Sequence, residues 1–281
     1  MGLEINANQP IAGVNSNFFI NPIQSERTNL LKHIKLDNKP DSVETNTDVS
    51  KYGKKEAVLG MIKANPKIIQ ILNDSKIPIR INMKVLDDLN KNHLPETKKA
   101  ALGIINNLPQ EFKSAVNYQS IQKAAILHDY GKALIPESIL NKSGELSEDE
   151  FKIMQKHAIL SYEMLKTTDL DNETLELVKN HHQNAQKTGY PEVGDNFVAD
   201  LNSQILSTAD MYSALREKRA YKPEMSKNQA LSIIHDEMKS AKIHPMVFKA
   251  LVDFANKQES STVINPQWQL TDYQPVNRLS A

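Results

Sequence analysis

The chain has 281 residues, of which 40% are hydrophobic, so it is long enough to enclose a sizeable core. Its 34 basic and 34 acidic residues cancel, which argues against a general attraction to DNA or to an anionic membrane. The absence of cysteine excludes disulfides, thiolate metal sites and cysteine nucleophiles. No apolar run reaches the roughly 20 residues of a membrane span, and no signal-peptide pattern opens the chain, so we expect a cytoplasmic protein.

The pattern of polar and apolar residues changes along the chain. It begins polar and aperiodic, then shows apolar residues three and four positions apart, with Pro66 and Pro78 dividing the first such run into short helices. Strand-type alternation is nearly absent, which predicts an all-α fold. The predicted organisation is an irregular N-terminal arm (1–50), a short helical segment (51–80), a larger helical domain (81–257) and a loose C-terminal tail (258–281).

Several helices of the main domain have clear signals. The stretch IQKAAILHDYGK (121–132) predicts a helix whose apolar character places its C-terminal end inside the protein. Two capping boxes predict helix starts, one with Ser147 and Glu150 and one with Ser226 and Gln229. Further helices are expected at 173–182, 201–216 and 245–257.

Polar clusters punctuate these predicted helices. Histidine and aspartate suit iron, manganese, cobalt, nickel or zinc, and two ions held side by side need several such ligands with a carboxylate to bridge them. The number of histidines and aspartates in these clusters fits a two-metal centre, with Asp129 as the expected bridging ligand. The candidate ligands are His128, Asp129, His157, His181, His182 and Asp210, with His93 as a further candidate.

The doublet His181-His182 is unusual in a chain with eight histidines. Neighbouring imidazoles gain nothing from each other in a core, because each needs its own hydrogen-bond partner. Adjacent helical residues diverge by about 100°, so we expect the doublet to serve two neighbouring ions of one cluster. The pair His235-Asp236 has no other site feature beside it and is interpreted as a surface pair.

The motifs that contain the candidate ligands follow one another in a fixed order along the chain. AAILHDYGKALIPESILNKSGELSEDEFKIMQKH is followed by NHH, GYP, ILSTADMYSALREKRAYK and QALSII. From about residue 93 to 255 the chain thereby resembles the HD-GYP family, the branch of the HD phosphohydrolase superfamily associated with cyclic di-GMP hydrolysis. The resemblance implies that residues 81–257 form an HD-GYP-like catalytic domain, an HD-type helical bundle. It also implies metal ligation by His128, Asp129, His157, the histidine doublet and Asp210.

The resemblance also implies residues that act on a substrate. Lys132 corresponds to the family lysine beside the reacting phosphate, where an ammonium could neutralise charge developing on oxygen. Arg219 and Lys222 correspond to positions that contact the substrate phosphates. The turn Gly189-Tyr190-Pro191 is expected among the substrate-binding residues. We assign catalytic roles to Asp129 and Lys132.

The chain departs from the family pattern in two places. The loop after the doublet has Gln183 in place of glutamate and Gln186-Lys187 in place of Asp-Gly, which alters how the loop or a ligand is held. Upstream, some members have a glutamate one turn before the first histidine, whereas Leu89 precedes His93 here. We therefore expect two metals rather than three, with iron and manganese both compatible with the ligand set.

The leading hypothesis is a bacterial signalling hydrolase, a metal-dependent phosphodiesterase acting on cyclic di-GMP or a related cyclic dinucleotide through a hydroxide shared by two divalent ions. One alternative is a module that binds a cyclic dinucleotide or a protein with little turnover, since the loop is altered. Another is an HD phosphohydrolase that acts on a different nucleotide. DNA is not an expected partner, while a second copy of the chain or another signalling protein is a further candidate partner.

Overall fold

The fold is taken from a computed structural model, and the residues described are 48–217 and 224–260. The regular elements of these residues are helices, and no strand occurs among them, which confirms the all-α prediction. The elements in chain order are η3 (Val49–Gly53), α2 (Lys55–Ala64), α3 (Pro66–Asp74), α4 (Met83–Lys91), α5 (His93–Asn107), α6 (Gln110–Lys113), α7 (Tyr118–Leu127), η4 (Tyr130–Leu134), α8 (Glu137–Leu140), α9 (Glu148–Leu165), α10 (Asn172–Asn180), α11 (Leu201–Arg216), α12 (Lys227–Lys239) and α13 (Pro245–Ser260).

The capping residues predicted from the sequence are found at the starts of their helices. Ser147 accepts a hydrogen bond from the backbone N–H of Glu150, whose side chain accepts one in return from the N–H of Ser147, so the predicted capping box opens α9. Ser226 and Gln229 form the same arrangement at α12. Pro66 occupies the first turn of α3, where its missing N–H costs nothing.

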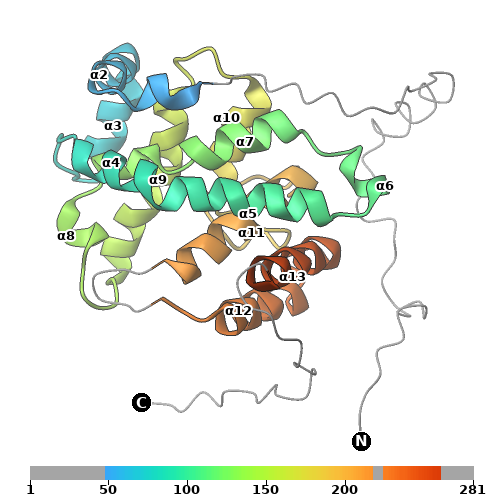
Figure 1. Ribbon diagram of the computed structural model, residues 1–281. Coiled ribbons are helices and arrows are strands. Elements are labelled where there is room, and N and C mark those ends of the chain that lie inside the picture. The colour runs from blue at the N-terminus through green and yellow to red at the C-terminus, as the bar shows by residue number, and fades with distance from the viewer. Residues whose placement is uncertain (1–47, 218–223, 261–281) are drawn as a thin grey trace, which may run out of the picture. The chain divides into compact units, whose positions relative to one another are not determined.

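Helix α5 lies at the centre of the helical unit. It packs against α7, α11 and α13, while α9 packs against η4 and α10 (Figure 1). Buried apolar side chains fill the space between these helices, among them Leu94, Ile104, Leu127, Leu160 and Ile205. The packing brings the end of α7, the start of α5 and the middles of α9 and α11 to one place.

Helix α7 ends earlier than expected, and His157 lies in the interior of α9. The predicted helix over 121–132 ends at Leu127, and after Asp129 the chain continues as the 3-10 turn η4. The reason is packing, because η4 must press closely against α9 at Gly131. Helix α9 continues well past His157 to Leu165, so this histidine projects from the middle of a helix.

The predicted domain end, arm and tail can be compared with the described residues only in part. Helix α13 continues to Ser260, beyond the expected end of the domain at residue 257. Most of the predicted arm and tail, 1–47 and 261–281, lies outside the described residues. Among the described helices, none combines the length and the apolar content needed to cross a membrane.

Candidate metal centre

Asp129 lies at the junction of α7 and η4 with its side chain fully buried. Its Oδ1 is 3.2 Å from His157 Nε2 and 3.8 Å from His181 Nε2. Its Oδ2 is 3.4 Å from His93 Nε2 and 3.5 Å from His128 Nε2. The two oxygens of one carboxylate therefore face two different sets of imidazoles.

These sets are two groups of ligand atoms, each compact enough to hold one metal ion. Within either group the ligand atoms lie within 4.8 Å of one another, and Asp129 belongs to both groups. All seven predicted candidates are members. The first group is Asp129, His157, His181 and His182, and the second is His93, His128, Asp129 and Asp210.

The histidine doublet does not divide between the groups as expected, because both imidazoles enter the first one. The expectation assumed helical geometry for both residues. Helix α10 ends at Asn180, and His182 instead forms an isolated bridge with Tyr190, so its direction is not set by the helical 100° step. The two rings lie 4.1 Å apart between centroids. His182 also approaches Asp210, with 3.8 Å between its Nδ1 and Oδ2 of the carboxylate.

The orientation of the imidazoles points to a cation. Nδ1 of His157 lies 2.6 Å from the carbonyl oxygen of Met154, and Nδ1 of His181 lies 2.7 Å from that of Val178. Because a carbonyl only accepts, each Nδ1 carries the proton, and a neutral ring then has a lone pair at Nε2. The two Nε2 atoms are 3.3 Å apart, so two lone pairs face each other. A cation bound by both atoms would relieve this conflict.

Unsatisfied buried atoms support the same interpretation. His128 directs Nδ1 at the Ala125 carbonyl oxygen, 3.1 Å away, which leaves Nε2 for the centre. Nε2 of His128 and Oδ1 of Asp129 have no hydrogen-bond partner. A buried polar atom without a partner is costly unless a ligand satisfies it. The donor set of imidazoles and carboxylates fits divalent transition metals.

The protonation states also suit metal ligation. Burial lowers the pKa of His157 to about 3 and that of His182 to about 4, so both rings are neutral at neutral pH. Burial alone would raise the pKa of Asp129, but the Lys132 ammonium and His128, whose own pKa the carboxylates raise, hold it well below its usual value. The histidine neighbours of Asp210 likewise hold its pKa well below the usual value despite its burial. Neutral imidazoles and charged carboxylates are the forms that bind metals.

Gly131 allows α9 to approach Asp129. A Cβ at this position would lie 2.2 Å from the His157 carbonyl oxygen and 2.6 Å from the backbone nitrogen of Ser161. The N–H of Gly131 donates to Oγ of Ser161 at 2.7 Å, which fixes the contact. The glycine in His-Asp-Tyr-Gly-Lys is therefore what brings His157 within reach of the carboxylate.

The altered loop after the doublet is closed by its own residues. Gln183 is buried, and its Nε2 donates to the carbonyl oxygen of Pro191 at 2.6 Å while its Oε1 accepts from the N–H of Gly189 at 3.3 Å. Lys187, which stands where the family has glycine, has a φ of 55°, in the left-handed region that glycine prefers. Gly189 passes so close to His182 that a Cβ would lie 1.9 Å from its carbonyl oxygen.

Tyr190 forms one wall of the centre. Its ring lies 4.5 Å from that of His182 between centroids, and Phe151 of α9 meets it edge-on at 6.1 Å. Phe151 is an exposed aromatic residue, with 47% of its surface accessible. The Gly-Tyr-Pro turn therefore packs on a member of the first ligand group and extends an aromatic surface toward solvent.

Lys132 and the basic residues complete the set of predicted site positions. Nζ of Lys132 lies 2.5 Å from Oδ2 of Asp129, with 19% of its side chain exposed. Arg219 and Lys222 lie outside the described residues. Sequence reasoning missed Glu217, whose Oε2 lies 3.7 Å from Nδ1 of His93. Nothing in the sequence other than its place seven residues after Asp210 marks it.

The family model of the HD domain matches residues 82–247, more than half of the chain. The chain belongs to the HD domain family. This confirms the predicted HD assignment, and the matched region contains both ligand groups. His128 and Asp129 are the pair of residue types for which the HD domain is named.

Curated relatives are about a third identical to this chain over the stretches that they match. A 3'3'-cGAMP-specific phosphodiesterase 1 of Vibrio cholerae is 31% identical over 53% of this chain and 35% of its own length. A probable cyclic di-GMP phosphodiesterase of the same species is 37% identical over 46% of this chain and 31% of its own length. The chain thus spans about a third of the length of these relatives. A solved HDG"Y"P protein of Bdellovibrio bacteriovorus covers 83% of this chain and 80% of its own at 16% identity, with a TM-score of 0.47, a distant match that adds nothing to the assignment.

Proposed function

We propose that this HD domain is a metal-dependent phosphodiesterase that hydrolyses a cyclic dinucleotide. The observation that carries the proposal is the buried Asp129, whose two oxygens face two compact groups of imidazoles. The names of the relatives, which include enzymes acting on 3'3'-cGAMP and on cyclic di-GMP, support this substrate class. Both dinucleotides are therefore the substrates to test first.

We propose that each ligand group would hold one divalent ion, and Asp129 belongs to both groups. When bound, such a pair supplies a water molecule activated near neutral pH and positive charge at the scissile phosphate. Iron and manganese are the ions we propose, because imidazole and carboxylate ligands serve both. The neutral state of His157 and His182 keeps their nitrogen lone pairs available at physiological pH.

Lys132 is the residue we propose to act on the reacting phosphate. Its ammonium lies against Asp129, and its side chain is partly exposed, so it can reach a group bound over the centre. A positive charge held there stabilises negative charge that develops on a phosphoryl or leaving oxygen. The contact with Asp129 also keeps the lysine in place before substrate arrives.

The Gly-Tyr-Pro turn forms the substrate side of the proposed site. Tyr190 covers His182, and Phe151 continues the aromatic surface outward. Aromatic faces are suitable platforms for nucleobases. Arg219 and Lys222 remain proposed phosphate contacts on the strength of the family resemblance.

The test is hydrolysis of cyclic di-GMP and 3'3'-cGAMP by protein loaded with Fe²⁺ under reducing conditions or with Mn²⁺, with linear dinucleotide as the product. We expect turnover, and we expect Lys132→Met to reduce kcat by about 10²-fold or more while metal content is retained. Lys152→Met, which removes an exposed lysine of α9, is the matched control and should retain activity. Tight ligand binding with full metal content and no product would instead identify a binding module, and turnover of linear nucleotides alone would change the substrate class.

A further inference from the structure

The imidazole of His93 is held differently from its neighbours. His128, His157 and His181 each direct Nδ1 at the carbonyl oxygen three residues earlier. His93 is the first residue of α5, so no preceding turn of that helix offers it a carbonyl, and its buried Nδ1 has no hydrogen-bond partner. If Nε2 is a ligand, Nδ1 carries the proton and needs an acceptor.

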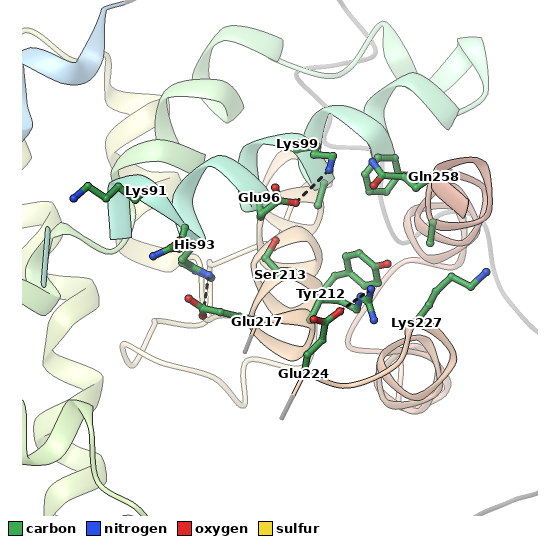
Figure 2. A pocket seen from close by; sticks show the side chains of 15 residues that line it. Lys91, His93, Glu96, Lys99, Tyr212, Ser213, Glu217, Glu224, Lys227 and Gln258 are labelled. Atoms are coloured by element: carbon green, nitrogen blue, oxygen red, sulfur yellow. Dashed lines mark hydrogen bonds and ion pairs between the residues drawn. The ribbon is translucent and has the colours of Figure 1, made fainter. Parts of the chain in front are cut away.

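A carboxylate faces this nitrogen. Oε2 of Glu217 lies 3.7 Å from Nδ1 of His93, as the dashed line in Figure 2 marks. On the other side of the ring, Oδ1 of Asp210 lies 2.9 Å from Nε2. Asp210 is in α11 and Glu217 is its C-cap, two helical turns later on the same side. The C-terminal half of α11, with its C-cap, therefore places one carboxylate near each nitrogen of the imidazole.

A cavity leaves Glu217 room to complete the contact. Glu217 and His93 both line a cavity of about 490 Å³ between α5 and α11 (Figure 2). The distance from Oε2 of Glu217 to Nδ1 of His93 needs to shorten by only about 0.5–1 Å to become a hydrogen bond. Two further glutamates line the same cavity and form ion pairs there, Glu96 with Lys99 at 3.4 Å and Glu224 with Arg216 at 3.0 Å.

We propose that Glu217 is a positioning residue that accepts a hydrogen bond from Nδ1 of His93 and holds that ring as a ligand of the second metal group. This inference rests on the proposed metal-dependent function. A carboxylate behind a ligating histidine fixes its tautomer and orientation and strengthens it as a donor, and its loss typically weakens metal binding 10- to 100-fold.

The experiment is titration of the metal-free full chain with Mn²⁺, followed by calorimetry and by elemental analysis after gel filtration, for the wild type and Glu217→Gln. The variant keeps the shape of the side chain and removes its charge. We expect two binding events in the wild type, with one of them weakened about 10- to 100-fold in the variant and the other unchanged. Glu224→Gln, in the same cavity but paired with Arg216, is the matched control and should bind both ions normally.

Thermal unfolding of the metal-free proteins separates positioning from structural support. Equal melting temperatures for the wild type and Glu217→Gln, together with the selective loss of one ion, support the proposal. Unchanged binding of both ions overturns it, as does a parallel loss of both ions and of metal-free stability. A wild type that binds no Mn²⁺ overturns the metal-dependent function itself, and the role of Glu217 with it.

Discussion

Replacing Gly131 with alanine should separate two elements of the metal centre. The new Cβ would lie 2.2 Å from the carbonyl oxygen of His157, which must retreat by about 1.2 Å before ordinary contact begins at 3.4 Å. The backbone of Ser161 is almost as close, so no flexible side chain can yield instead. Because φ of Gly131 is outside the left-handed region, the effect is purely steric.

The cost follows from these contacts. Overpacking of a close-packed interior costs about 1–3 kcal/mol, and loss of the buried hydrogen bond from Gly131 to Ser161 adds about 1–3 kcal/mol. We therefore expect the free energy of unfolding to fall by about 2–6 kcal/mol in urea titrations of the metal-free protein. Metal affinity should fall as well, because α9 carries His157 away from Asp129, to which it is now 3.2 Å distant.

Gly60 provides the control. It lies exposed in the interior of α2, and a Cβ added there would meet no other atom within 4 Å, so Gly60→Ala should stabilise the protein by about 0.5–1 kcal/mol. If Gly131→Ala had the stability and the metal affinity of the wild type, the close approach of η4 to α9 would not be what positions the centre.

Three further predictions concern the loop and the protonation of the centre. Lys187→Gly should be about 0.5–1 kcal/mol more stable to urea than Lys187→Ala, because φ at this position is 55°; equal stability would show that the turn carries no strain. Gln183→Glu should lower the free energy of unfolding by about 1–3 kcal/mol at pH 7, although it restores the family residue, because the donor to the Pro191 carbonyl is lost; an unchanged urea midpoint would contradict this. His157 and His182 have folded pKa values of about 3 and about 4, below the ordinary 6.5, so the unfolded chain binds more protons below pH 6.5. The metal-free protein should therefore become less stable as the pH falls from about 6.5 to about 4, and a flat or rising urea midpoint over this range would be the opposite result.

Much of the fold was predictable because its signals are local. Helix α11 begins and ends where the apolar spacing indicates, and both capping boxes form, since each depends only on residues within one turn. The candidate ligands could be named because ionisable side chains on apolar helices are costly without a partner. Their ordered spacing, matched to a known family, then distinguished Asp129 from Asp236.

The features that could not be predicted depend on contacts across the chain. Helix α7 ends at Leu127 because η4 packs closely against α9. The direction of His182 is set by its bridge to Tyr190. Glu217 is adjacent to His93 only because α11 packs on α5, and the intervening sequence gives no sign of this. In each case tertiary packing decides where a side chain points.

The metal content of the purified protein tests the central claim most directly. Protein purified without chelator or added metal, under reducing conditions, should contain two divalent ions per chain. Asp129→Asn, which replaces a shared carboxylate with one neutral amide oxygen, should contain fewer than one. Equal metal content in the two proteins, or none in the wild type, would contradict a centre built on Asp129.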